Sequence, residues 1–296
     1  MSLSPRLVYA ARAELAEGPV WHQGALWWVD IVVGTLNRLD VATGLNTSRA
    51  TGGFLGCAVP CTDGRWLLAR QHDCVLLDWD TGRIERFLGC CPGVLPRHRF
   101  NDGKCDPLGR FWAGTMSLDR ARGETALFSI EPSGEMRRVL EGLSLSNGLG
   151  WTGRGDAFFH VDTPTRRIVR YRFDPASGTV AEPRVLIEFE EKDGWPDGLT
   201  CDAEGHLWVG LFGGGALVRV QGEEGRILER VPMPVSNVTS CTFGGADLST
   251  LYITTAWEGF SLAQREAEPL AGSIFSLRVE TPGFPVVPFA LASSRH

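Results

Sequence analysis

Four short segments of the sequence place oxygen-bearing side chains next to a glycine. They contain Glu17, Asn101 with Asp102, Asn147, and Asp197, and each lies about thirteen to fifteen residues before the end of an apolar strand such as LWWVD or LWVGL. If these positions are equivalent in a repeat, closing the repeats around an axis brings their oxygen atoms together. Carboxylate and amide oxygens favour hard divalent cations. Glu17, Asn147 and Asp197 are therefore candidate ligands of one metal ion.

Tight turns are the alternative explanation of these segments, because Asn-Gly and Asp-Gly are common turn pairs. Glu-Gly is not a favoured turn pair, and four segments at one phase are harder to explain as turns alone. Three protein ligands would leave coordination positions for water and substrate, as in a catalytic site. Cysteine shares this phase only at Cys57 and Cys241, and no pair of zinc-spaced C-x-x-C motifs occurs, which argues against a structural zinc ion.

Six short apolar strands would position these residues. They recur every 40 to 49 residues or so, at 26–30, 66–70, 111–115, 158–162, 207–211 and 251–255, with turns such as LDVATG and FDPASG between them. A period of roughly 45 residues without helical periodicity is typical of β-propeller blades, since one blade cannot bury both faces alone. A two-sheet sandwich would explain the strands but not the period.

The sequence thus predicts an all-β fold, a six-bladed β-propeller with about four antiparallel strands per blade around a central channel. We expect one domain over residues 1–296, with the first strand near residues 7–10 joining the last near 274–277 to close the ring.

The composition and net charge of the chain limit the classes of molecule that it is expected to bind. The chain has 296 residues, 43% of them hydrophobic, a net charge of -6 and scattered Lys and Arg, which argues against nucleic acid and anionic membranes as partners. No apolar run is long enough for a signal-peptide core or a membrane span. We expect a cytoplasmic protein whose cysteines are reduced and mostly buried; the oligomeric state is not indicated.

Five stretches resemble the senescence marker protein, regucalcin and gluconolactonase family. They are AEGPVW (16–21), RFNDGKCDPLGRFWAGTM (99–116), SNGLGW (146–151), PDGLTCDAEGHLWVGLFGGG (196–215) and TSCTFGGADLSTLYITTA (239–256). The resemblance covers about 250 residues and all six units in order. Members of this family are six-bladed propellers that bind one divalent ion in the central channel and hydrolyse sugar lactones, and the resemblance implies the same here.

The resemblance also implies roles for particular residues. It places the ligands of one divalent ion (Ca²⁺, Zn²⁺, Mn²⁺, Mg²⁺ or Fe²⁺) at Glu17, Asn147 and Asp197. Substrate contacts fall on Arg99 and Asn101, and Asp102 lies beside them. A family glutamate after the GTM segment falls on Asp119, whose shorter side chain reaches less far. Asn237 matches a position that resembles the pocket of bacterial aldonolactonases.

The expected reaction is hydrolysis of an aldonolactone to the aldonic acid, which is carboxylic ester hydrolysis. The ion would polarise the lactone carbonyl or activate water, and Asp197 would act as general base. A carboxylate bound to a cation is a weaker base, so ion-activated water is the alternative. Arg99 offers a planar fork of donors to substrate oxygens, unless it is simply a solvated surface arginine.

Two other functions fit the same architecture: a propeller phosphotriesterase or aryl esterase, and a non-catalytic calcium-binding module. No G-x-S-x-G nucleophile elbow is present, and GLFGGG lacks the context of a nucleotide-binding loop. His160 is expected to be a hydrogen-bonded core residue, and Trp21 and Trp195 to serve packing. Lys104 is either a charge behind the site or a turn residue.

Overall fold

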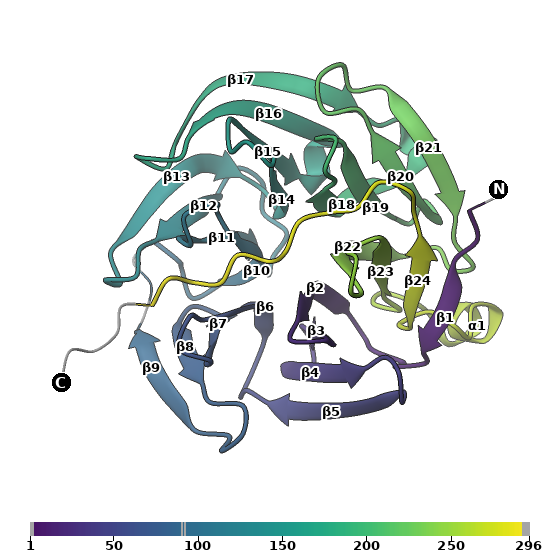
Figure 1. Ribbon diagram of the computed structural model, residues 1–296, viewed down its shortest axis with the longest axis horizontal. Helices are drawn as coiled ribbons and strands as arrows, with labels where there is room; N and C mark the ends of the chain where they lie inside the picture. The colour runs from purple at the N-terminus through teal and green to yellow at the C-terminus, as the bar shows by residue number, and fades with distance from the viewer. Residues whose placement is uncertain (1–2, 90, 92, 292–296) are drawn as a thin grey trace.

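The computed structural model describes residues 3–89, 91 and 93–291. Within these residues, six four-stranded antiparallel sheets surround a central axis (Figure 1), which confirms the predicted six-bladed propeller. The first blade contains β2 (Ala16–His22), β3 (Ala25–Asp30), β4 (Thr35–Asp40) and β5 (Leu45–Ala50). The second contains β6 (Leu55–Pro60), β7 (Trp66–Arg70), β8 (Cys74–Leu77) and β9 (Ile84–Leu88).

The next three blades follow the same order from the axis outward (Figure 1). The third contains β10 (His98–Cys105), β11 (Phe111–Ser117), β12 (Thr125–Ile130) and β13 (Met136–Leu143). The fourth contains β14 (Ser146–Trp151), β15 (Ala157–Asp162), β16 (Arg167–Asp174) and β17 (Thr179–Glu188). The fifth contains β18 (Trp195–Cys201), β19 (Leu207–Phe212), β20 (Ala216–Val220) and β21 (Ile227–Pro232).

The sixth blade closes the ring with strands from both ends of the chain. It contains β22 (Val238–Gly244), β23 (Thr250–Thr255) and β24 (Ile274–Arg278), and its outermost strand is β1 (Arg6–Tyr9). Strand β1 pairs antiparallel with β24, so that Arg6 lies opposite Ser276 and Leu7 opposite Phe275. The predicted pairing of the first and last strands is therefore confirmed.

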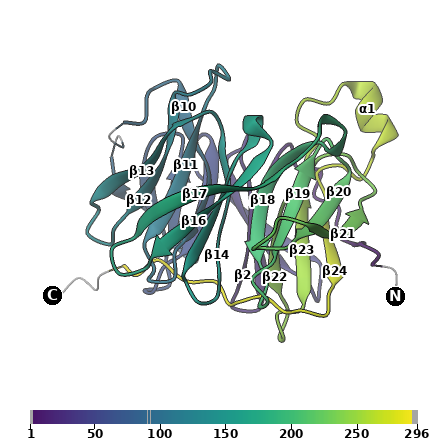
Figure 2. The same ribbon diagram turned by 90° about the horizontal axis from the view of Figure 1, so that it is seen from above.

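Helical structure is confined to short segments between strands. Helix α1 (Leu262–Ala267) lies between β23 and β24, and two 3-10 turns, η1 (Thr163–Thr165) and η2 (Glu191–Asp193), precede β16 and β18. Figure 2 shows α1 at one end of the propeller, while the C-terminal segment after β24 crosses the opposite end. No helix in the described ranges is long and apolar enough to cross a membrane.

The six strands predicted from apolar runs are the second strands of the blades. All six residues of β3 are buried, because neighbouring blades cover both of its faces. The outermost strand of the same blade, β5, is mostly exposed and polar. The seven cysteines among the described residues are free and buried, as expected; Cys90 lies outside the described residues.

Every innermost strand contains a shift in register of the kind that a β-bulge produces. The shifts fall between Glu17 and Val20, Leu55 and Cys57, Phe100 and Gly103, Asn147 and Leu149, Pro196 and Leu199, and Val238 and Ser240. A bulge bends a strand and re-aims its side chains. The four polar-glycine segments coincide with four of these shifts, so they lie inside strands, and the tight-turn alternative is excluded.

Three of the glycines in these segments, Gly103, Gly148 and Gly198, are needed because adjacent inner strands approach each other closely, whereas Gly18 is uncrowded and has a positive φ of 49°. A Cβ atom on Gly148 would lie 2.5 Å from the carbonyl oxygen of Asp197, and one on Gly198 would collide with the side chain of Ser240. Only glycine allows two backbones to pack at this distance. The pairing of a polar residue with glycine therefore reflects the narrow centre of the propeller.

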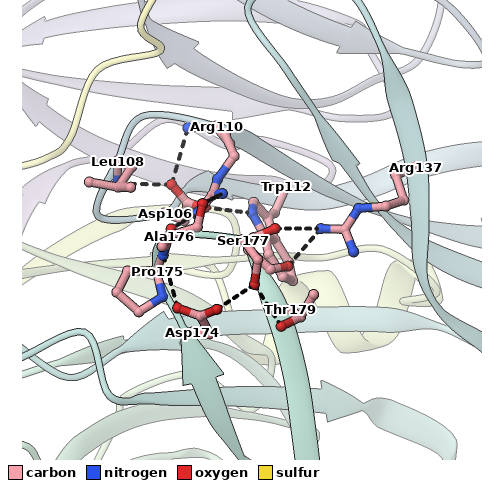
Figure 3. Close-up of polar contacts among 11 residues, drawn as sticks. Asp106, Leu108, Arg110, Trp112, Arg137, Asp174, Pro175, Ala176, Ser177 and Thr179 are labelled. Atoms are coloured by element: carbon pink, nitrogen blue, oxygen red, sulfur yellow. Dashed lines mark hydrogen bonds and ion pairs between the residues drawn. The ribbon is translucent and has the colours of Figure 1, made fainter.

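Buried aspartates fix the turns that follow the inner strands at the end of the ring opposite the polar-glycine segments. Figure 3 shows Asp106, which is fully buried, accepting hydrogen bonds from the Leu108 and Arg110 backbone nitrogens and from the Trp112 indole. The Arg110 guanidinium binds Asp106 at 2.6 Å and also donates to the Pro175 carbonyl of the fourth blade. This network joins the third and fourth blades and leaves Asp106 no role in the channel.

Candidate metal and substrate site

The bulged inner strands bring Glu17, Asn147 and Asp197 together in the channel. Glu17 comes from β2, Asn147 from β14 and Asp197 from β18, and all three side chains are buried, with 4–6% exposure. Asn147 Nδ2 donates a hydrogen bond to Asp197 Oδ1. Glu17 and Asp197 are also close enough for a side-chain hydrogen bond. The three residues that the sequence predicts as metal ligands thus lie in one cluster.

Crowding of carboxyl groups raises the pKa values in this cluster. Burial, and then the charge of Asp102, raises the pKa of Glu17 to about 8. Burial raises the pKa of Asp197 as well, and the charges of Glu17 and Asp102 raise it further. Burial also raises the pKa of Asp102, although the Lys104 ammonium opposes this. Desolvated carboxylates that repel one another are stabilised by a cation among them.

The donor atoms fit a hard divalent cation. The amide oxygen of Asn147, Oδ1, is buried and has no hydrogen-bond partner among the described residues. Together with the Glu17 and Asp197 carboxylates it forms an all-oxygen set of the kind that Ca²⁺, Mg²⁺ and Mn²⁺ prefer. Across the described ranges, no three His, Cys, Asp or Glu side chains come together to hold a metal. A site here therefore requires the Asn147 amide.

Arg99 and Asn101 form a second polar group on β10. Arg99 is buried, so the solvated-surface alternative is excluded. Its Nη1 atom donates to Asn101 Oδ1 at 2.8 Å and to the Phe100 carbonyl at 2.9 Å, while Asn101 Nδ2 donates to the Ser146 carbonyl at 3.1 Å. Burial lowers the pKa of Arg99 to about 10, and nearby carboxylates oppose this shift, Glu258 most strongly. The arginine stays charged at neutral pH.

Asp102 and Lys104 lie further along the same strand. Asp102 is buried and accepts a hydrogen bond from the Gly103 backbone nitrogen at 2.7 Å. Lys104 Nζ reaches the Leu199 carbonyl in the fifth blade at 2.9 Å, so the lysine spans the channel. Lys104 is therefore a charge behind the site, not a turn residue.

Asp119 and Asn237 occupy different environments. Asp119 is exposed in the turn after β11, and no hydrogen bond joins it to a described channel residue. Its negative charge favours the protonated forms of Arg97 and His98, which lie at the start of β10. Its role as a substrate contact stays a prediction. Asn237 is buried and donates to the Glu258 carbonyl at 3.4 Å.

Three residues proposed as packing residues behave as expected. His160 is buried and shares a 2.8 Å hydrogen bond with Ser146, and burial lowers the pKa of His160 to about 3. Trp21 stacks on Tyr252 with ring centroids 5.2 Å apart. The Arg166 guanidinium lies over the Trp195 ring, with its Cζ atom 3.8 Å from the ring centroid.

Two further residues reach the site from loops. Glu258 lies in the connection between β23 and β24, and the negative charge of its carboxylate stabilises the charged form of Arg99. Thr163, in the connection between β15 and β16, accepts a hydrogen bond from Asn147 Nδ2 at 3.1 Å. Glu258 precedes Gly259 but lies outside the phase of the four polar-glycine segments, and Thr163 has no glycine beside it, so the repeat gave no signal for either. For Thr163, its place directly after the strand FFHVD was the only available clue.

A cavity of about 480 Å³ lies in the channel, and Asp102 and Lys104 of β10 form part of its wall. Its wall includes Thr200, Ser240 and Thr242 from inner strands, together with residues 284–288 of the C-terminal segment. Glu17, Asn147 and Asp197 do not line it. Asp102 and Gly18, which is next to Glu17, do line it, so the cavity extends up to the inner strands that carry the candidate site.

The fold and this cluster define a six-bladed propeller with a buried all-oxygen donor set and an arginine in its channel. Residues 15–257 match the family described as the SMP-30/Gluconolactonase/LRE-like region, and the chain belongs to that family. This confirms the family expected from the sequence motifs.

Two relatives cover nearly the whole chain. The Bacillus subtilis protein YvrE, named as a sugar lactone lactonase, is 37% identical over 94% of this chain and 96% of its own length. Pentonolactonase XacC of Haloferax volcanii is 35% identical over 92% and 93%, respectively. Such relatives support the expected class, an enzyme that hydrolyses carboxylic esters.

A solved structure shares the whole architecture. Regucalcin from Agrobacterium tumefaciens, described as a calcium-binding protein, superposes with a TM-score of 0.93 and 28% identity, covering 98% of this chain and 99% of its own. A divalent metal is thus documented for a member of the family.

Proposed function

We propose that this protein hydrolyses sugar aldonolactones to aldonic acids with the help of one divalent ion held by Glu17, Asn147 and Asp197. The observation that carries the proposal is the convergence of two carboxylates with an amide oxygen that has no partner among the described residues. When bound, the ion would polarise the lactone carbonyl or a water molecule. Membership of a family with named sugar lactonases supports the reaction class.

Arg99 and Asn101 would orient the substrate. The Nη1 atom of Arg99 donates hydrogen bonds to Phe100 and Asn101. Its Nη2 atom has no hydrogen bond to the described residues and would be available to donate to a lactone oxygen. Asn101 is held by Arg99 and Ser146 and does not need substrate to be ordered. A preformed polar wall of this kind favours a substrate with several hydroxyl groups.

Asp197 would act as the general base. It would accept a proton from the attacking water while the water oxygen bonds to the carbonyl carbon, and would return the proton to the ring oxygen as the ester bond breaks. Its Oδ1 atom accepts a hydrogen bond from Asn147, which fixes the orientation of the carboxylate. Burial raises the pKa of Asp197 in the metal-free cluster, and a bound cation would oppose that shift and keep the carboxylate ionised, as a proton acceptor needs to be.

A panel of pentono- and hexonolactones, assayed for acid release with and without chelator, tests the proposal. We expect turnover that chelator abolishes and a divalent cation restores. Paraoxon and an aryl acetate in the same assay distinguish a phosphotriesterase or aryl esterase, and the buried Arg99 predicts poor turnover of both. Absence of chelator-sensitive turnover of every lactone would contradict the proposal.

A further inference from the structure

Thr163 lies between two of the candidate ligands. It is the first residue of η1, and its backbone nitrogen donates to the Leu145 carbonyl at 3.1 Å. Pro164 is the second residue of the same turn, and its fixed φ angle suits the start of a helical turn. The threonine is therefore held firmly beside β14 and β18.

The hydroxyl of Thr163 makes two hydrogen bonds of opposite sense. It accepts from Asn147 Nδ2 at 3.1 Å and donates to the Pro196 carbonyl at 2.9 Å. A hydroxyl has a single proton, and here that proton is used by Pro196. Thr163 Oγ1 therefore accepts from Asn147, so the amide nitrogen of Asn147 faces it.

This arrangement determines which way the Asn147 amide points. Both hydrogens of Nδ2 are used, one by Thr163 Oγ1 and one by Asp197 Oδ1. A flipped amide would turn Oδ1 toward a carboxylate and toward a hydroxyl that has no proton left to donate. Oδ1 is consequently kept away from both, in the buried position where it has no partner among the described residues.

We propose that Thr163 is a positioning residue for metal binding, which rests on the proposed function. It turns the Asn147 amide so that Oδ1 faces the ion, and it ties the Pro196 carbonyl immediately before Asp197. Partners that orient metal ligands in this way typically contribute 10- to 100-fold in metal affinity. Thr163 touches neither ion nor substrate in this account.

The chain offers a matched control two residues away. Thr165 is exposed, lies in the same 3-10 turn and donates its hydroxyl to the Asp162 carbonyl at 2.7 Å, without a hydrogen bond to the Asn147 side chain. Thr163→Val keeps the shape of the side chain and removes both hydrogen bonds. Thr163→Ser restores the hydroxyl, and Thr165→Val removes a hydroxyl from the same turn.

Calorimetric titration of the chelator-treated full chain with Ca²⁺ and with Mn²⁺ tests the role. We expect Thr163→Val to weaken binding about 10- to 100-fold, and Thr163→Ser and Thr165→Val to bind like the wild type. The melting temperature of each chelator-treated variant separates a folding defect from a binding defect. A purely structural role would lower that temperature and leave the dissociation constant unchanged.

Two results overturn the inference in distinguishable ways. If the wild type binds and Thr163→Val binds equally tightly, or if Thr163→Ser loses as much affinity as Thr163→Val, the positioning role is wrong while the metal site stands. If the wild type binds neither ion, the proposed metal site fails, and the role of Thr163 fails with it.

Discussion

Asp197 combines two demands in one side chain. As a ligand it needs to be ionised beside a cation, and as a general base it needs to accept a proton. Asn147 of the fourth blade donates a hydrogen bond to Oδ1 of Asp197. Burial, and then the charge of Glu17 in the first blade, raise the pKa of Asp197. Its chemistry therefore depends on neighbours in two other blades.

Asp197→Asn keeps the size of the side chain and removes its proton acceptor. We expect kcat for lactone hydrolysis to fall at least ~100-fold, measured with an ion concentration shown by titration to saturate the variant. Asp156→Asn, on an exposed turn, is the control. A variant of Asp197 that retained wild-type kcat would show that another group is the base.

Arg99 is predicted to act through the geometry of its guanidinium. Arg99→Lys retains the charge and loses the planar fork, so KM for the lactone should rise about tenfold, or ~1.4 kcal/mol, with a smaller change in kcat. Arg97→Lys is a close control, because Arg97 pairs with Glu124 at the surface. Equal KM values for the two variants would remove Arg99 from the substrate site.

At the scale of elements, the inner strands explain why the common position of the polar-glycine segments in the repeat predicts residues of the channel. The same bulge that turns Asp197 into the channel brings β18 so close to β22 that Gly198 has no room for a side chain. Close approach explains the glycines beside Asn147 and Asp197, and the shared phase predicted that Glu17, Asn147 and Asp197 would lie together, as the structure has them. The fully buried second strands, such as β3, were found because their apolar runs are continuous.

Gly198→Ala tests this account of the inner strands. The added methyl group would overlap the Ser240 side chain and push β18 away from β22, which we expect to cost about 1–3 kcal/mol of unfolding free energy and to weaken metal binding. In Gly89→Ala the nearest atoms to the methyl group among the described residues would belong to the flexible Arg86 side chain, at 3.6 Å, so this variant is the control. Urea denaturation measures both, and equal stability of the two would contradict the account.

Loops between strands limited what the sequence could predict. Thr163 and Glu258 reach the site from connections whose lengths differ from blade to blade, so no repeat phase marks them. Asp119 illustrates the same difficulty. Its position after the GTM segment predicts a contact with substrate, but the turn that contains it leaves the residue exposed. Side-chain reach from a loop depends on backbone conformations that the spacing of residues does not specify.

At the scale of the whole molecule, the closed ring holds carboxylates from separate blades in one desolvated place. The strand β1 completes the sixth blade through its pairing with β24, so the inner strands cannot separate to relieve repulsion without opening the ring. Folding of the chain and the charge of the channel should therefore be coupled.

The stability of chelator-treated protein should fall as pH rises. Burial raises the pKa of Glu17 from 4.5 to about 8, so between these values the folded chain keeps a proton that the unfolded chain has lost. Stability is fully present below pH 4.5 and falls toward pH 8, by up to ~1.4 kcal/mol per pH unit for this group. Thermal unfolding measures it, and Glu17→Gln should flatten the slope. A slope that Glu17→Gln leaves unchanged would rule out Glu17 as its cause.

The position of the ion tests the central claim most directly. Anomalous diffraction from crystals soaked in Mn²⁺ should reveal one peak in the channel, with oxygen atoms of Glu17, Asn147 and Asp197 within about 2.6 Å. A channel without a peak, or a peak bound by other residues, would contradict the account.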